Sequence, residues 1–332
     1  MNLGRFKRRI YTPYYTPIQE LKRFSEALGG PKVFAKRDDL LGLSGGGNKT
    51  RKLEFLVADA LDKGADTLVT CGAVQSNHCR LTLAAAVKEG LKCRLVLEER
   101  IPGSYDPNAS GNNFLFRMLG VEAITVVPGG SDMMAEMKKI AREVESLGRQ
   151  AYIVPGGGSN EIGSLGYVQC AQELQQQMFD YGMDFDYIVV PSGSGGTHAG
   201  FLVGVYGNNM NIPVLGVSVS RSTDVQIEKL YPLIKSVATH VGCPIPPMEK
   251  VIVYDEYVGE GYGRPTDGMK EAVQLLAQTE AILLDTVYTG KQMAGLIDLV
   301  RKGFFKPTDK VLFLHTGGAP SLYHYSKSVL PD

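Results

Sequence analysis

The segment YIVVPSGSGGTHAGFLVGVYG (187–207) passes from a β-branched apolar run through a glycine-rich loop into a second apolar run of helical length. A strand followed by a tight loop and a helix is the repeating unit of a parallel α/β sheet. Comparable short apolar runs occur at 66–71, 93–98, 123–128, 151–155, 213–220 and 310–316. Segments that suit helices lie beside them, at 49–63, 76–89, 131–147, 160–181 and 197–207. We therefore predict an α/β fold whose strands are mostly parallel and covered on both faces.

The composition narrows the class of protein. The 332 residues suffice for about two domains. Lys plus Arg and Asp plus Glu both number 35, so no basic excess favours nucleic acid, and 44% hydrophobic residues exclude a disordered chain. No apolar run approaches the ~18 residues that span a bilayer, and the first residues lack the apolar core of a secretion signal. We expect a cytoplasmic globular protein that binds neither nucleic acid nor membrane.

Five cysteines are scattered along the chain without a CxxC pair: Cys71, Cys79, Cys93, Cys170 and Cys243. An odd number without paired spacing is typical of reduced, mostly buried thiols. We expect neither a disulfide framework nor a metal site.

The loop SGSGGTHAG (192–200) follows an expected strand and leads into a helix. Ligands of open α/β sheets bind beyond the carboxyl ends of the strands, where loop and helix N–H groups are free. Glycines and hydroxyls at this place predict a phosphate cradle, although tight helix packing alone would also use glycines. The loop lacks the lysine of a P-loop and the spacing of GxGxxG, which argues against ATP and dinucleotides.

A lysine stands in a second glycine-rich segment, SGGGNKTRKLEF (44–55). If Lys49 lies at the mouth of the sheet, partial desolvation lowers its pKa and suits it to form a Schiff base. The alternative is a solvated lysine in the first turn of a helix.

Two further sets of polar residues follow expected strands. In CGAVQSNHCR (71–80), Ser76 or Asn77 can cap a helix whose first amides face a carboxylate, or can serve as a plain cap. Tyr262 and Tyr288 lie in glycine-rich loops, and Thr316 precedes two glycines in LFLHTGGAP (312–320). A buried tyrosine is more often a packing residue than an acid or base.

Together these motifs resemble those of the fold type II pyridoxal-phosphate (PLP) enzymes, which share a fold like that of tryptophan synthase β. The similarity is strongest to the group of D-cysteine desulfhydrase, L-cysteate sulfo-lyase and 1-aminocyclopropane-1-carboxylate (ACC) deaminase. It runs nearly end to end, through YTPIQEL, KRDDLLGLSGGGNKTRKLEF, GAVQSNHCR, SGSGGTHAG, GYGRP, VYTGKQMAGL and HTGGAP. The N-terminal pattern and DLLGLSGGGNKTRKLEF look closest to L-cysteate sulfo-lyase.

The resemblance implies a role for each matching residue. Lys49 would bind the cofactor aldehyde and then move the substrate α-proton. Catalytic roles would fall to Lys49, Ser76, Tyr262 and Tyr288. The cofactor would be held by Asn48, Lys49, Asn77, Ser192, Gly193, Ser194, Gly195, Gly196, Thr197, Tyr288 and Thr316. The substrate would contact Ser76, Asn77, His78 and Tyr262.

The resemblance also implies two open, twisted α/β domains and a homodimer. Residues 55–167 would form a small mobile domain, and residues 1–54 with 168–332 a large PLP-binding domain. The substrate would be a small sulfur-containing amino acid.

One position separates members of the group. ACC deaminases carry a Glu after the tyrosine equivalent to Tyr288, whereas this chain has Thr289, and Thr316 stands where they have an apolar residue. A neutral hydroxyl stabilises a protonated pyridine less than a carboxylate does. This disfavours ring opening and favours β-elimination to pyruvate and ammonia, with sulfite from L-cysteate or sulfide from D-cysteine.

Two other classes stay open at this point. A non-catalytic binding protein of the same fold would keep the 192–200 loop without needing Lys49. A nucleotide-dependent oxidoreductase would use the loops for pyrophosphate, but the GxGxxG and the acidic residue about twenty positions later are missing.

Overall fold

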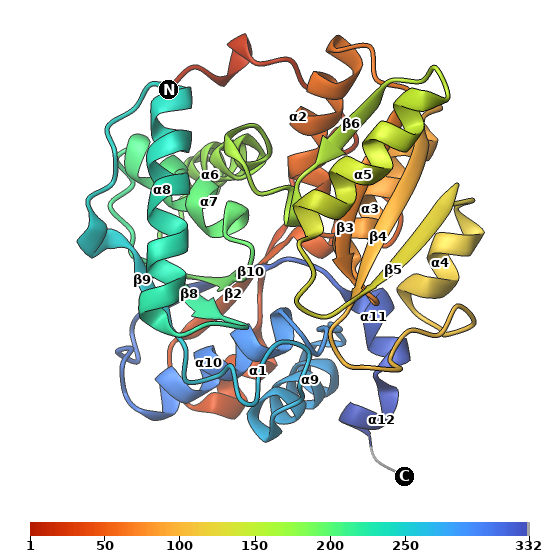
Figure 1. Cartoon of the computed structure of the whole chain (residues 1–332). Helices are drawn as coiled ribbons and strands as arrows, with labels where there is room; N and C mark the ends of the chain where they lie inside the picture. Colours follow the sequence, from red (N-terminus) through yellow and green to blue (C-terminus); the bar gives the residue numbers. More distant parts are fainter. Residues whose placement is uncertain (331–332) are drawn as a thin grey trace.

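The computed structural model describes residues 1–330, which form two mostly parallel sheets with helices on both faces (Figure 1). The larger sheet has six strands in the order β1–β2–β10–β7–β8–β9. They are β1 (Ile18–Glu20), β2 (Lys32–Arg37), β7 (Tyr187–Ser192), β8 (Val214–Ser218), β9 (Ile252–Tyr254) and β10 (Lys310–His315). Every neighbouring pair is parallel except β1 and β2. The predicted α/β class is confirmed.

The smaller sheet has four parallel strands in the order β5–β4–β3–β6. They are β3 (Thr67–Ala73), β4 (Lys92–Glu99), β5 (Ala123–Pro128) and β6 (Ala151–Val154). The predicted domain limits, 55–167 against 1–54 with 168–332, assign each sheet to one domain. These limits stay a prediction.

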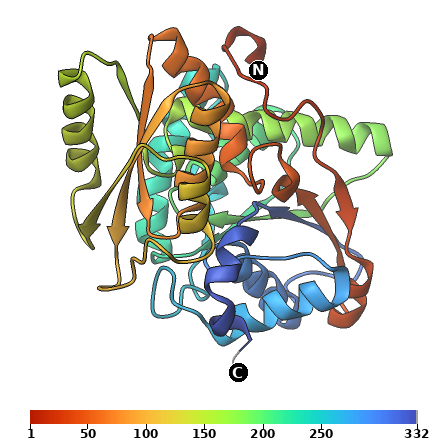
Figure 2. The same cartoon turned by 90° about the vertical axis from the view of Figure 1, so that its right-hand side faces the viewer.

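Helices cover both faces of each sheet (Figures 1 and 2). They are α1 (Lys22–Leu28), α2 (Lys49–Asp62), α3 (Asn77–Lys88), α4 (Asn112–Met118), α5 (Met133–Ser146), α6 (Glu161–Tyr181), α7 (Gly196–Gly207), α8 (Thr223–Val241), α9 (Asp267–Glu280), α10 (Thr289–Arg301), α11 (Ala319–His324) and α12 (Ser326–Val329). On the larger sheet, α6, α7 and α8 share a core on one face and α1, α9 and α10 on the other. On the smaller sheet, α2, α3 and α4 pack against one face and α5 against the other.

Strand β10 has four consecutive apolar residues, 311–314, because both of its faces are buried. Val311 and Phe313 point into the core with α9 and α10, whereas Leu312 and Leu314 point into the core with α6 and α7. Successive side chains of a strand face opposite sides, so a strand buried on both faces needs apolar residues at every position. The last strand of the chain therefore lies in the middle of the sheet, between β2 and β7.

Three strands, β1, β2 and β9, were not predicted from the sequence. β2 has the sequence KVFAKR, in which charged residues flank only three apolar ones. β1 and β9 have only three residues each. The charge at Lys36 is accommodated because its side chain is fully buried in an ion-pair network described below.

Three further observations concern membrane-spanning helices, metal-binding side chains and cysteines. No helix within residues 1–330 combines the length and the apolar character needed to cross a membrane. Over the same residues, no group of three His, Cys, Asp or Glu side chains is placed to hold a metal ion. The five cysteines are free thiols, and four of them are buried.

Candidate active site

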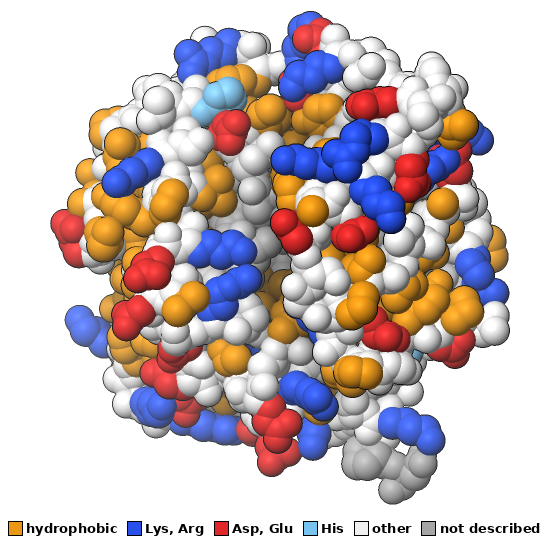
Figure 3. Space-filling view, viewed as in Figure 1, with side chains coloured by type: hydrophobic (Ala, Val, Ile, Leu, Met, Phe, Trp, Pro, Cys, Tyr) orange, Lys and Arg blue, Asp and Glu red, His pale blue; other side chains and the backbone are white. Residues whose placement is uncertain are grey.

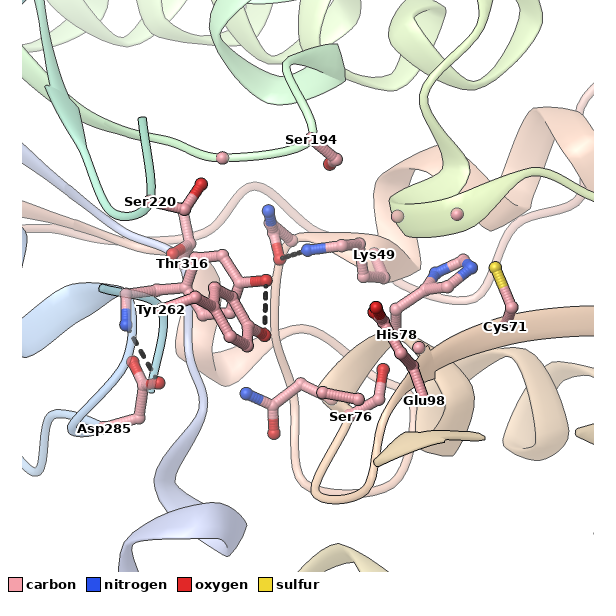
Figure 4. A pocket seen from close by; sticks show the side chains of 18 of the residues that line it. Lys49, Cys71, Ser76, His78, Glu98, Ser194, Ser220, Tyr262, Asp285 and Thr316 are labelled. Carbon is pink, nitrogen blue, oxygen red and sulfur yellow. Dashed lines mark hydrogen bonds between the residues drawn. The ribbon is translucent and has the colours of Figure 1, made fainter. Parts of the chain in front are cut away.

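One cavity lies between the two sheets, beyond the carboxyl ends of their strands (Figures 3 and 4). It is lined from the ends of β3, β4, β7 and β10 and from the first turns of α2 and α3. Ten of the predicted site residues line it: Asn48, Lys49, Ser76, Asn77, His78, Gly193, Ser194, Tyr262, Tyr288 and Thr316. Four others, Ser192, Gly195, Gly196 and Thr197, are not among its lining residues.

Lys49 is the first residue of α2 and faces this cavity (Figure 4). Its side chain is 8% exposed, and its Nζ donates a hydrogen bond to Asn48 Oδ1 at 3.0 Å. Burial lowers the pKa of the ammonium to about 8, with Asp285 opposing the shift and Arg80 adding to it. A substantial neutral fraction at mildly alkaline pH makes this amine a nucleophile and a base. The predicted desolvated lysine is therefore present.

The glycines before Lys49 have a conformational reason. Gly45, Gly46 and Gly47 all have positive φ, and a Cβ on Gly46 would overlap the carbonyl oxygen of Asp39. The tight turn lets the Asn48 N–H bond the carbonyl oxygen of Thr316 at 3.0 Å. The start of α2 is thereby joined to the end of β10.

A buried ion-pair network holds the first turn of α2. Arg51 donates to both carboxylate oxygens of Asp38 at 2.8 Å and to Glu173 Oε2 at 2.7 Å, and Lys36 also pairs with Glu173. All four side chains are at most 3% exposed. Because the network connects β2, α2 and α6, it fixes the position of Lys49 two residues away.

The 192–200 loop connects β7 to α7 as expected, but its hydroxyl side chains point in different directions. Ser192 Oγ is buried and bonds Gln226 Nε2 and His198 Nδ1, so it supports the loop from behind. Ser194 lines the cavity, and Thr197 Oγ1 accepts a hydrogen bond from Asn48 Nδ2 at 2.8 Å. Ser194 therefore faces the cavity and Ser192 does not, and the phosphate cradle stays a prediction.

Lys52 was missed by the sequence analysis. Its side chain is 1% exposed, and its Nζ donates to the carbonyl oxygen of Gly157 at 3.0 Å beside Ser159. A Cβ on Gly196 would lie 2.9 Å from this nitrogen, which places it at the start of α7. Within residues 1–330, no carboxylate pairs with it, and burial together with Lys49 lowers its pKa strongly. The available signal was its spacing of three residues from Lys49, which puts both on one helix face.

At the start of α3, hydrogen bonds fix the orientation of the Asn77 side-chain amide. Ser76 caps the helix by accepting from the Cys79 N–H at 3.1 Å. Asn77 Oδ1 accepts from Arg80 Nη1 and from Asn112 Nδ2, both at 2.9 Å. With its oxygen occupied, Asn77 keeps its NH₂ group free to donate.

His78 lines the cavity as a neutral ring. The Thr70 hydroxyl donates to the Val154 carbonyl oxygen at 2.9 Å, so it accepts from His78 Nε2 at 2.8 Å. Burial and the nearby Lys49 and Lys52 hold the pKa of His78 well below its usual value. The Nε2–H of the ring is thus bound to Thr70, and the predicted contact of His78 with the substrate carboxylate stays a prediction.

Tyr262 and Tyr288 meet in the cavity, and Figure 4 labels Tyr262 there. Their hydroxyls lie 2.9 Å apart, and their rings are at 77°. Lys49 Nζ is 5.6 Å from the centre of the Tyr288 ring. The pair can hold a proton close to the amine.

Asp285 is a buried carboxylate in the cavity that the sequence analysis missed. It accepts hydrogen bonds from the N–H groups of Val287, Tyr288 and Thr289 at the start of α10, and from the Thr289 hydroxyl at 2.7 Å. The Thr289 side chain is thus bound to Asp285, and Thr316 is the threonine that lines the cavity. An Asp four residues before an N-terminal helix residue was the available signal.

These residues fit a phosphorylated aldehyde. An amine of lowered pKa faces the cavity, and the buried Lys52 amine, which has no carboxylate partner, lies at the start of the glycine-rich helix α7, whose N-terminus favours an anion. The model of the family described as pyridoxal-phosphate dependent enzyme matches residues 11–317. The chain belongs to this family. Its cofactor is pyridoxal 5′-phosphate, as predicted.

Solved structures agree with this assignment. The crystal structure of an ACC deaminase homologue is 40% identical, with a TM-score of 0.89 over 98% of this chain and 96% of the other. A fungal L-serine ammonia-lyase from Rhizomucor miehei is 20% identical, with a TM-score of 0.67 over 95% and 97%. A PLP-dependent aspartate racemase is 19% identical, with a TM-score of 0.65 over 92% and 90%. The last two likenesses concern the fold, which is the predicted fold type II architecture.

Proposed function

We propose that this enzyme eliminates the β-substituent of a small sulfur-containing amino acid and yields pyruvate and ammonia. L-cysteate, with release of sulfite, is our first candidate substrate, and D-cysteine, with release of sulfide, is the second. The observation that carries the proposal is the buried Lys49 amine, whose pKa is lowered to about 8, beside the Tyr262–Tyr288 hydroxyl pair.

The cofactor, when bound, supplies an aldehyde that condenses with the substrate amino group and an aromatic ring that withdraws electrons from the α-carbon. Lys49 would hold it covalently through Nζ. Lys52 and the start of α7 would hold its phosphate, because a buried lysine without a carboxylate partner lies beside the first turn of a helix, whose N-terminus favours an anion.

The protein side chains then move the protons. The amide of Asn77 and the first turn of α3 orient the reacting molecules, with Ser76 holding that turn. Neutral Lys49 Nζ takes the proton from the α-carbon, and the electrons of the broken C–H bond form the Cα–Cβ double bond. The electrons of the Cβ–S bond leave with sulfur, and the Tyr262–Tyr288 pair can protonate a leaving sulfide. The released enamine takes up water and gives pyruvate and ammonia.

Two other activities have less support. ACC deamination would place a carboxylate at residue 289, whereas this chain has Thr289, which is hydrogen-bonded to Asp285. A non-catalytic binding protein would have no need to desolvate Lys49 beside two tyrosine hydroxyls.

The experiment is a parallel assay of sulfite and pyruvate from L-cysteate and of sulfide and pyruvate from D-cysteine. We expect pyruvate with one sulfur product, and no product from Lys49→Ala. Borohydride reduction of the loaded enzyme followed by peptide mapping should label Lys49. A label on another lysine, or no pyruvate from either substrate, would show the proposal to be wrong.

The assembly and location inferred from the resemblance belong to the same proposal. We propose a cytoplasmic homodimer, whose mass in solution would be about twice the 36.0 kDa of the chain. Light scattering of the purified enzyme tests the dimer.

A further inference from the structure

Three basic residues line the same cavity without a role in the steps above: Arg100, Arg221 and Lys229. Arg100 follows β4 of the smaller sheet, Arg221 follows β8 of the larger sheet, and Lys229 lies on α8. Residues from both sheets thus bring positive charge to one cavity. Figure 3 shows basic side chains at the edge of the hollow between the two parts of the molecule.

Two of these cations have no carboxylate partner. Arg100 pairs with Glu98 at 2.6 Å, but no ion pair within residues 1–330 includes Arg221 or Lys229. Arg221 Nη1 instead contacts neutral oxygens, the carbonyl oxygen of Gly193 and the hydroxyl of Ser220, both at 3.2 Å. The carboxylates of Glu98 and Asp285 line the same cavity, but Glu98 pairs with Arg100 and Asp285 is bound to the start of α10. Arg221 and Lys229 therefore keep a positive potential on their side of the cavity, which an anionic ligand would neutralise.

The charges lie close to the reacting end of the site. The guanidinium carbon of Arg100 is 4.1 Å from the centre of the Tyr262 ring. Burial, Arg221 and Arg100 lower the pKa of Lys229, so the two arginines lie close enough to repel the Lys229 ammonium. Arg100 and Arg221 also act electrostatically on the Tyr288 hydroxyl.

We propose that Arg221 and Lys229, aided by Arg100, form a subsite for a second anionic group on the substrate. The enzyme would then select amino acids whose β-substituent is an anion, such as a sulfonate, over those with a neutral thiol. This inference rests on the proposed function and specifies its substrate class. A sulfonate has three acceptor oxygens, which suit donors that approach from both sheets.

The cavity also explains why a neutral substrate would be rejected. A thiol bound there would neutralise none of these charges and would still displace their water. An amino acid with a second anionic group would place that group between Arg100, which follows a strand of the smaller sheet, and Arg221, which follows a strand of the larger sheet.

The test compares L-aspartate with L-asparagine on the PLP-loaded enzyme. These amino acids are nearly isosteric, differ by one charge, and carry the carboxylate where L-cysteate carries the sulfonate. Binding is followed by the change in cofactor absorbance, which does not require elimination. We expect L-aspartate to bind at least about tenfold more tightly, as for a charge-assisted hydrogen bond.

Three variants complete the experiment. Arg221→Gln and Lys229→Gln should each weaken L-aspartate about five- to tenfold and leave L-asparagine unchanged. Lys235→Gln is the control, because Lys235 is exposed on the same helix and does not line the cavity. The PLP dissociation constant of each variant is measured separately.

The outcomes separate the two proposals. Equal binding of L-aspartate and L-asparagine, or equal weakening of both in the variants, overturns the subsite. Loss of PLP affinity with unchanged selectivity also overturns it and assigns the cations to the cofactor phosphate. Selective, variant-sensitive binding of L-aspartate without any sulfite or sulfide production would support the subsite and refute the proposed elimination.

Discussion

We expect Lys52→Met to leave the apoenzyme as stable as the wild type or more stable, and to weaken the binding of PLP. The lysine is 1% exposed, and its Nζ has one close partner, the Gly157 carbonyl oxygen at 3.0 Å. Methionine keeps the unbranched chain and removes the charge. Without cofactor, the loss of one hydrogen bond, worth about 1 kcal/mol, is offset by the removal of a buried amine that has no counter-charge and is costly to desolvate. We expect the unfolding free energy of the apoenzyme to stay within about 1 kcal/mol or to rise.

The loaded enzyme should behave in the opposite way. If Lys52 binds the cofactor phosphate, the substitution removes an ion-to-ion hydrogen bond worth about 1.5–3 kcal/mol. The PLP dissociation constant should then rise about 10- to 150-fold, and the stabilisation by PLP should fall accordingly.

The assay is a titration of apoenzyme with PLP followed by absorbance, together with thermal unfolding of both forms. Lys63→Met is the matched control, since Lys63 follows the same helix, is 59% exposed and pairs with Asp59. It should leave PLP affinity unchanged. Unaltered PLP affinity in Lys52→Met, or an apoenzyme destabilised by more than about 3 kcal/mol, would refute the reasoning.

Three other substitutions and conditions test separate parts of the site. The rate at which apoenzyme takes up PLP should rise with pH through about 8, because burial lowers the pKa of Lys49 and the neutral amine attacks the aldehyde; a midpoint near 10 would contradict this. Glu173→Gln should destabilise the protein by about 3–5 kcal/mol in urea unfolding, since it leaves Arg51 and Lys36 under-compensated, whereas exposed Glu143→Gln should cost at most about 1 kcal/mol. Tyr262→Phe should lower kcat about 100-fold if its hydroxyl transfers a proton, with PLP affinity unchanged; equal kcat would exclude that role.

Local patterns carried the most accurate predictions. The run at 187–191, its glycines and the following helix form β7, the loop and α7, because strand and helix periods and the need for positive φ are properties of neighbouring residues. Lys49 and Tyr288 were found in the same way, since glycine-rich turns beside strands and helices mark the sheet edge where ligands bind.

What the sequence by itself determined is therefore the class of fold, the family and its cofactor, and ten of the residues that line the cavity. The tertiary structure decided the direction of each side chain. Ser192 bonds Gln226 behind the loop, Lys52 lacks a counter-charge, and Asp285 binds the start of α10. The partners of Ser192 and Lys52, Gln226 and Gly157, lie 34 and 105 residues away along the chain, and such a distant hydrogen-bond partner or a missing counter-charge has no local signature. The partners of Asp285 are local, and its signal was the position before the start of α10. Only folding, which places β10 between β2 and β7, brings such groups within bonding distance.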